Sequence, residues 1–307
     1  MAGPTFRSWR RADGRFVVRA LAIALLALIG TPALACPDGS HRFETFSLPA
    51  PGLGHAKRML VWLPPGYDCT DRRYPVLYLN DGHDLFAWNP FAADLEPALA
   101  AEIAKREGWY GSWRLDEQLK RAIAAGLLPA MIAVGIAADD GLRSRDLAPV
   151  PWDGSADARG ARYAAFVAGT VVAAVDQAYR TIDAPRCRGI GGAALGGVSA
   201  LQIGLAHPER FGLVLAFSPV LTDSALAGAI AGAWPRAGPA QALLVDFDDD
   251  PIGRADRRWL ASLLAATGRS ARETTVLQSA GGRHAIASWA ERVIPALARL
   301  FDRRCLE

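Results

Sequence analysis

Short apolar runs alternate with longer segments of helical spacing along most of this 307-residue chain, and this alternation restricts the fold more than any other feature. Several runs are apolar at consecutive positions, as in strands of a parallel sheet that is covered on both faces. The runs predict strands at residues 75–80, 130–136, 188–191, 213–217, 242–246 and 274–278. The segments between them predict helices at residues 116–125, 162–179, 195–206, 254–266 and 285–301. Such alternation is typical of an α/β fold with a doubly wound, mostly parallel sheet.

An antiparallel strand pair is predicted at the start of this sheet. Residues 43–48 and 59–63 are apolar stretches, and a segment rich in Gly and Pro, residues 49–54, joins them. No low-complexity linker, repeat or charge block interrupts residues 36–307. We therefore predict that these residues form a single domain.

The composition excludes several classes of protein. Apolar residues make up 51% of the chain and charged residues 21%, which excludes disorder over most of its length. The formal charge is only +3, from 34 basic and 31 acidic residues, so no nucleic-acid partner is expected. No run of twenty apolar residues is present, and we expect no membrane span.

Residues 1–35 have the features of a signal peptide. Several arginines precede the apolar run 20–29, and the small residues Ala33 and Ala35 flank Leu34 at the end of the segment. We predict cleavage after Ala35 and a secreted or periplasmic protein. Lipoprotein processing at Cys36 is less favoured, because Ala33 stands where a lipobox usually has leucine.

Export would place the cysteines in an oxidising compartment, where disulfides form. The even number of cysteines, Cys36, Cys69, Cys187 and Cys305, allows several pairings. Cys36 and Cys69 flank the predicted antiparallel pair at one end, while Cys187 begins a strand and Cys305 follows the last helix. This arrangement favours the pairs 36–69 and 187–305. The cysteines lack the spacing of metal ligands, and no metal or cofactor is predicted.

A glycine-rich turn, residues 189–197, joins a predicted strand to a predicted helix. The turn matches the dinucleotide-binding pattern G-x-G-x-x-A weakly, because it lies deep in the domain and because Glu209, about 20 residues later, precedes the next predicted strand instead of ending it. It also matches the nucleophile elbow G-x-S-x-G at Gly192 and Gly196. The central residue of that elbow is Ala194, which has no nucleophilic atom.

The chain resembles the putative-esterase family of α/β-hydrolases, which includes enterochelin-esterase-like and feruloyl-esterase-like proteins. The resemblance extends from about residue 59 to residue 301 and depends on the order of several motifs. These are YPVLYLNDGHDLF at 74–86, WRLDE at 113–117, RDLAP at 145–149, YRT at 179–181, HPERFG at 207–212, FSP at 217–219 and GGRHAIASW at 281–289. It implies an α/β-hydrolase fold with nucleophile, acid and histidine in that order.

The resemblance also implies roles for individual residues. His284 falls on the general base, and Asp250 falls on the acid that orients the histidine, with Asp248 or Asp249 as alternatives after a small register shift. The backbone N–H groups of Leu195 and His83 correspond to the oxyanion hole. The family's serine falls on Ala194, so this degenerate position cannot form an acyl-enzyme.

Three hypotheses of function follow. The first is an exported homologue that is deficient in serine-dependent ester hydrolysis and acts as a binding or accessory protein. The second is an active carboxylic ester hydrolase in which His284 and Asp250 activate water. The third is a structural protein of the cell envelope without a small ligand.

A small ester, or an acyl or aromatic compound, is the expected ligand of the first two. Aromatic residues in the segments above the predicted sheet line a cleft for it or pack within an inserted lid. They are Phe86, Trp88, Phe91, Trp109, Tyr110, Trp113 and Trp152.

Overall fold

The computed structural model describes residues 41–87, 112–138, 141–152, 154, 157–234, 241–267, 274–301 and 305. All of them belong to one compact unit, Asp38–Glu307. The predicted signal peptide and its cleavage site after Ala35 lie outside the described residues. So do Cys36, Trp88, Phe91, Trp109 and Tyr110.

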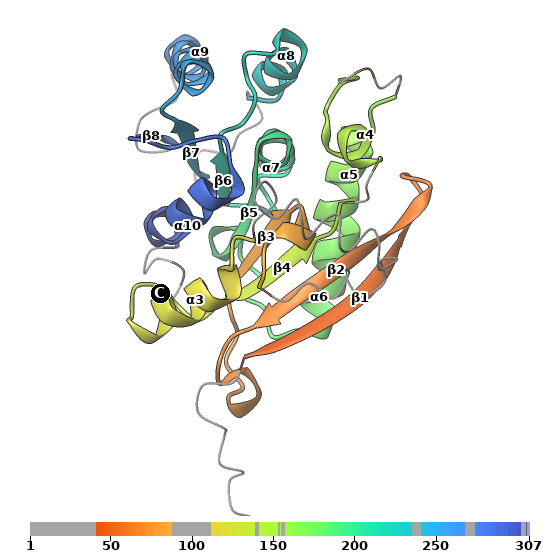
Figure 1. Cartoon of the computed structure of the whole chain (residues 1–307). Coiled ribbons are helices and arrows are strands. Elements are labelled where there is room, and N and C mark those ends of the chain that lie inside the picture. The colour runs from red at the N-terminus through yellow and green to blue at the C-terminus, as the bar shows by residue number, and fades with distance from the viewer. Residues whose placement is uncertain are drawn as a thin grey trace, which may run out of the picture. The chain divides into compact units, whose positions relative to one another are not determined.

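The described strands form an eight-stranded sheet in the order β1-β2-β4-β3-β5-β6-β7-β8 (Figure 1). The strands are β1 (Arg42–Ala50), β2 (His55–Leu63), β3 (Val76–Asn80), β4 (Ile132–Ile136), β5 (Arg188–Ala193), β6 (Leu213–Phe217), β7 (Ala242–Asp248) and β8 (Thr274–Ser279). β1 pairs antiparallel with β2, and β2 pairs antiparallel with β4. All strands from β4 to β8 run parallel. The predicted mostly parallel sheet with an antiparallel N-terminal pair is therefore confirmed.

Helices lie between the parallel strands along the chain, and one helix follows the last strand. They are α3 (Leu115–Ala124), α4 (Arg143–Leu147), α5 (Gly160–Phe166), α6 (Val172–Ala178), α7 (Leu195–Ala206), α8 (Ser224–Ala233), α9 (Pro251–Thr267) and α10 (Ile286–Leu300). A π-helical segment, η4 (Val167–Val171), separates α5 from α6 within the single helix that we predicted at 162–179. Short helical turns occur at η1 (Tyr67–Cys69), η2 (Gly82–Asp84) and η5 (Pro185–Cys187).

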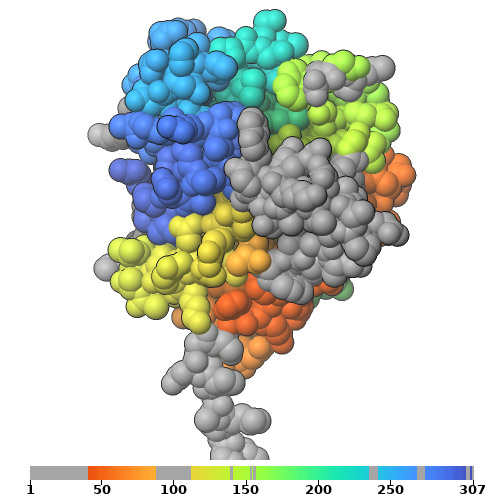
Figure 2. Space-filling model, in the orientation of Figure 1, coloured from red at the N-terminus to blue at the C-terminus, as the bar shows by residue number. Residues whose placement is uncertain are grey.

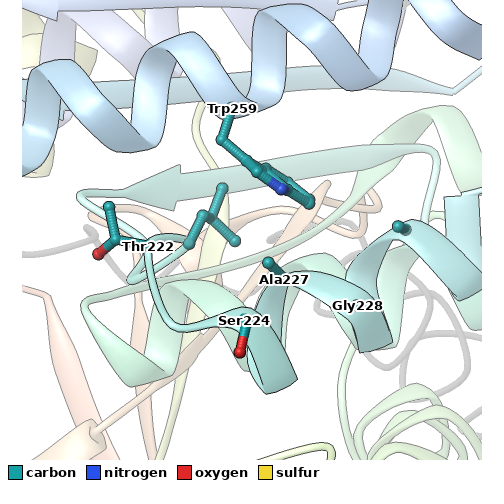
Figure 3. A pocket seen from close by; sticks show the side chains of 7 residues that line it. Thr222, Ser224, Ala227, Gly228 and Trp259 are labelled. Atoms are coloured by element: carbon teal, nitrogen blue, oxygen red, sulfur yellow. The ribbon is translucent and has the colours of Figure 1, made fainter.

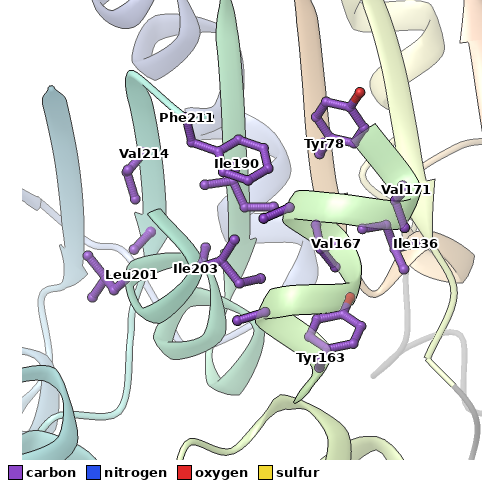
Figure 4. Close-up of a cluster of buried hydrophobic side chains, with 14 of the residues drawn as sticks. Tyr78, Ile136, Tyr163, Val167, Val171, Ile190, Leu201, Ile203, Phe211 and Val214 are labelled. Atoms are coloured by element: carbon purple, nitrogen blue, oxygen red, sulfur yellow. The ribbon is translucent and has the colours of Figure 1, made fainter. Parts of the chain in front are cut away.

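The two faces of the sheet bury separate apolar clusters, as expected for a doubly wound sheet. On one face α3 and α10 pack against β-strand residues such as Leu79 and Leu215. These two helices lie side by side on the surface (Figure 2), and the Gln118 side chain donates to the carbonyl of Ala290. On the other face α5, α6 and α7 cover the sheet, and Tyr78, Ile190 and Phe211 lie at the centre of that cluster (Figure 4).

A disulfide joins Cys187 to Cys305, with 5.1 Å between the two Cα atoms, and confirms this predicted pair. Cys187 directly precedes β5, so the bond attaches the end of the chain to the strand that leads into the glycine-rich turn. Cys69 is disulfide-bonded as well. Its predicted pairing with Cys36 involves a residue outside the described ranges.

Candidate active site

The turn from β5 into α7 has the backbone of a nucleophile elbow. Ala194 adopts φ 51° and ψ −123°, which places a non-glycine residue in the left-handed half of conformational space. A Cβ atom on Gly192 would lie 2.4 Å from the carbonyl oxygen of Gly196, so the turn needs glycine there. A Cβ atom on Gly196 would lie 2.6 Å from Oδ2 of Asp81. The two glycines therefore permit the strained conformation that lifts residue 194 above the sheet.

Neighbouring strands hold this elbow in place. The Asn80 side chain, at the end of β3, donates from Nδ2 to the carbonyl of Gly196 at 2.9 Å. Tyr163 of α5 donates its hydroxyl to Oδ1 of the same asparagine at 2.8 Å, which fixes the orientation of the amide. The N–H of Ala194 donates to the carbonyl of Phe217 at the end of β6. The contacts of Asn80 and Phe217 use the backbone of the elbow, and none of these hydrogen bonds requires a serine.

The two backbone groups predicted as oxyanion donors lie at the same edge of the sheet. Leu195 is the first residue of α7, so its N–H has no partner within the helix. His83 lies in η2, directly after β3, and β3 is the parallel neighbour of β5. A Cβ atom on Gly82 would lie 2.6 Å from the backbone of Gly135, so only glycine lets this turn approach β4. That the N–H groups of Leu195 and His83 form an oxyanion hole stays a prediction.

His284 contacts Asp248, the alternative that a small register shift allowed, and the first choice of partner, Asp250, is wrong. Nδ1 of His284 lies 3.2 Å from Oδ2 of Asp248, whose side chain is 2% exposed. The imidazole is 44% exposed and precedes α10. With Nδ1 engaged by the carboxylate, Nε2 is the ring atom available to a ligand.

Asp250 is used by the following helix instead. Its Oδ1 accepts a hydrogen bond from the N–H of Gly253 at 2.6 Å, in the first turn of α9. Pro251 follows it, which is the usual arrangement of an N-cap residue and a proline at the first helical position. β7 extends two residues beyond its predicted end at 246, so Asp248 becomes the last residue of the strand. Asp249 pairs with Arg254.

Three side chains that the sequence interpretation missed hold the Asp248–His284 pair. Arg292 of α10 donates from Nη2 to Oδ1 of Asp248 at 2.8 Å. Ser218 accepts a hydrogen bond from Nε1 of Trp289 at 2.9 Å and also interacts with Asp248. The Trp289 ring meets the imidazole edge to face, with 5.1 Å between centroids.

These contacts determine the charge of Asp248. Burial favours the neutral acid, but hydrogen bonds from His284 and Ser218 and the positive charge of Arg292 outweigh it, and the pKa of Asp248 falls below its ordinary value. Asp246, two residues earlier on the same face of β7, behaves in the opposite way. Burial is the dominant effect there and raises its pKa, although Ser279 donates to it and Arg292 lies 3.3 Å away.

A further ion pair lies beside the elbow. Arg143, the first residue of α4, donates two hydrogen bonds to the carboxylate of Asp81, at 2.7 and 2.8 Å. Asp81 has φ 58° and is the same residue whose Oδ2 faces Gly196. The sequence carries a signal for it, since Asp81 directly follows the apolar run of β3.

The described part of the predicted aromatic cluster belongs to the core. Phe86 is 1% exposed and Trp113 is 4% exposed, and both pack in the cluster beneath α3 and α10. Trp152 is partly buried against the opposite cluster. Among the described residues, no group of three His, Cys, Asp or Glu side chains could hold a metal ion. No helix of the described residues is long and apolar enough to cross a membrane.

The backbone links the two halves of the site. Ala194 donates to the carbonyl of Phe217, and the next residue, Ser218, donates from its N–H to the carbonyl of Asp246. The elbow, the β6 terminus and the acidic strand β7 are thus joined across one edge of the sheet, where ligands bind in open α/β sheets. The arrangement brings the imidazole of His284 and the carboxylate of Asp248 together, while residue 194 has no side-chain oxygen.

Several solved structures share this fold. A ferulic acid esterase superposes with a TM-score of 0.63 at 19% identity, over 86% of this chain and 98% of that one. The enterobactin esterase FES from Shigella flexneri superposes with a TM-score of 0.65 at 19% identity, over 90% of this chain but 62% of that chain. The enterobactin and salmochelin hydrolase IroE gives a TM-score of 0.59 at 16% identity, over 85% of this chain and 95% of that one.

Sequence comparison points in the same direction. The uncharacterized protein YbbA of Bacillus subtilis (strain 168) is 22% identical over 164 residues. That match spans 52% of this chain and 54% of the relative, so the chain covers about half the length of the curated relative it matches. The profile of the Putative esterase family matches residues 50–283, which is most of the chain. The chain therefore belongs to the Putative esterase family of α/β-hydrolases.

Proposed function

We propose that this protein is an exported, ligand-binding homologue of the esterases that is deficient in serine-dependent ester hydrolysis. The observation that carries the proposal is Ala194 at φ 51° and ψ −123°, in an elbow whose backbone is complete and whose central side chain has no oxygen. The groups that would bind an ester, namely backbone N–H donors and the imidazole of His284, do not depend on that oxygen.

The size of the expected defect follows from triad enzymes of other folds. Loss of the nucleophile alone lowers turnover by about a millionfold, and the oxyanion hole and substrate binding retain about 10³ to 10⁴ over the reaction in water. Ser199 cannot replace the missing oxygen, because it is fully buried within α7. Ser218 is 3% exposed and already accepts a hydrogen bond from Trp289.

The expected ligand is a small carboxylic ester or the corresponding acid, with an acyl or aromatic group. Similar structures are named for esterases of ferulic acid and of enterobactin. Because identity to them is 19%, they support the fold, and the ligand class is our inference from the site.

Export is supported by the cysteines as well as by residues 1–35. The Cys187–Cys305 bond and the bonded Cys69 are typical of proteins that fold in an oxidising compartment. We therefore infer a secreted or periplasmic location, with removal of the signal peptide after Ala35.

The test compares the wild type with Ala194→Ser on short p-nitrophenyl esters. We expect wild-type turnover of no more than about 10⁴ over the reaction in water, unchanged in His284→Ala, and at least about a thousandfold gain in the serine variant, since the remaining groups are in place. Wild-type turnover that falls sharply in His284→Ala would overturn the proposal.

A second candidate function is ester hydrolysis by water that His284 activates directly. The contacts of Asp248 with His284 and Arg292 favour it, because they hold a base ready without requiring a serine. In that case the wild type hydrolyses esters without a burst of product, and Ala194→Ser adds little to the rate.

A further inference from the structure

A groove of about 460 Å³ lies between α8 and α9, outside the candidate active site as described so far. Leu221, Thr222 and Ser224 line one end, and α8 contributes the small residues Ala227, Gly228 and Ala231. Trp259 extends from α9 toward Ala227 and Gly228 (Figure 3). The groove is thus a slot with an indole on one side and a smooth helix surface on the other.

The width of this slot depends on Gly228. Glycine is among the poorest helix formers, so it destabilises the interior of a helix relative to alanine. A Cβ atom on Gly228 would have nothing within 4 Å, so no packing contact requires glycine at this position. A larger side chain there would project into the groove opposite Trp259. Gly232, one turn further along α8, also has open space around its Cβ position but does not line the groove.

The groove is connected to the candidate site through a short loop. Ser218 contacts Trp289 and Asp248, and Leu221, three residues later, lines the groove. Three residues span at most about 11 Å, so Leu221 lies within that distance of Ser218, which interacts with Asp248.

Buried Asp256 holds the end of this loop. Its Oδ1 accepts a hydrogen bond from the N–H of Leu221 at 2.8 Å. The loop at the end of the groove is therefore attached to α9.

We propose that the groove between α8 and α9 binds a planar aromatic ring of the ligand whose ester or acid group lies at Ala194 and His284. This inference rests on the proposed function. A slot with an indole face suits a flat ring, because offset or edge-to-face aromatic pairs are favourable beyond the apolar area that they bury. A spacer of a few atoms between ring and carbonyl would bridge the loop from Ser218 to Leu221.

The experiment measures binding of methyl 3-phenylpropanoate, methyl octanoate and methyl acetate by titration calorimetry. The wild type is expected to prefer the phenyl ester. Gly228→Leu fills the slot and is expected to lower the affinity for the phenyl ester by about tenfold or more. Gly232→Leu makes the same change on the same helix and is expected to leave that affinity within about twofold of the wild-type value. Trp259→Leu removes the stacking face and should lower the affinity for the phenyl ester several-fold. Thermal unfolding of each variant checks that the fold is intact.

Each other outcome overturns the assignment. Equal binding of the phenyl ester to Gly228→Leu and Gly232→Leu would mean that the ring lies elsewhere. Equal or tighter binding of methyl octanoate would replace the aromatic ring by an alkyl chain. Absence of binding to the wild type would remove the groove as a subsite, while the proposed loss of serine-dependent hydrolysis is judged separately from ester turnover.

Discussion

The β5–α7 turn and the Asp248–His284 pair contribute to the candidate site in different ways. At the turn, the backbone does the positioning: Gly192 and Gly196 permit the geometry, and hydrogen bonds to main-chain atoms hold it. At the pair, side chains do the positioning, because Arg292, Ser218 and Trp289 fix a carboxylate and an imidazole.

This difference explains how the site can lack its nucleophile and still be built. A serine contributes one atom beyond alanine to the elbow, and the contacts that shape the elbow do not involve that atom. Removal of the Asp248 carboxylate would instead remove one hydrogen-bond acceptor of Arg292 and the contact that orients His284. We therefore expect the backbone half to tolerate side-chain change better than the side-chain half.

The largest expected effect concerns the side-chain half, measured once a serine is present. In the Ala194→Ser background, Asp248→Asn should lower turnover of p-nitrophenyl acetate by about 10⁴-fold, the cost of the same change in other triads. Asp250→Asn is the matched control, and it should have little effect because asparagine caps a helix as well as aspartate does. A larger loss in Asp250→Asn would return the role of the acid to Asp250.

A smaller effect is expected on the free energy of unfolding when the two carboxylates of β7 are replaced one at a time. At pH 7, Asp248→Asn should lower the free energy of unfolding by about 2 kcal/mol, since a charged acceptor of buried hydrogen bonds is lost. Asp246→Asn should leave it unchanged or raise it, because burial disfavours the charged form of Asp246.

The shifted pKa of Asp248 predicts how its contribution to the free energy of unfolding changes with pH. The pKa of Asp248 is lower in the folded protein, so its contribution is complete above the ordinary range of an aspartate. It is lost as the pH falls through the folded value, and the deficit of Asp248→Asn should shrink below about pH 4. Urea unfolding between pH 3 and 8 measures both variants, and a deficit that grows on acidification would contradict the assignment.

The smallest effect concerns the backbone half. Ala194→Gly should stabilise the fold by about 1 kcal/mol, because glycine adopts a positive φ without the strain that alanine carries. Ala193→Gly, the same change at the end of β5, should destabilise it by about 0.5 to 1 kcal/mol. Equal effects of the two substitutions in urea unfolding would show that Ala194 is not strained.

The sequence was sufficient for the elbow and insufficient for the acid, and the reason is physical. Gly192, Gly196 and His284 stand at fixed spacings from apolar runs, so their places follow from strand and helix periodicity. The choice between Asp248 and Asp250 depends on where β7 ends and on which carboxylate caps α9. Both depend on hydrogen bonds that local patterns do not encode.

Two helices were missed for related reasons. α8 is rich in alanine with two glycines, so it lacks the apolar periodicity of an amphipathic helix, although Asp223 caps it by accepting from the N–H groups of Ala225 and Leu226. α4 has only five residues and is held by the ion pair of Arg143 with Asp81 across a separation of 62 residues. The network of Ser218, Trp289 and Arg292 likewise joins segments that are distant in the chain.

The geometry of Ala194 also affects how easily a serine could arise at this position by mutation. Every alanine codon is one base change away from a serine codon, and the elbow already has the backbone that a serine would need. A single point mutation could therefore test in one generation whether hydrolysis is useful to the cell. Under the proposed function, a chain that binds esters without hydrolysing them lies one base change from a serine in this turn, and that change requires no alteration of the fold.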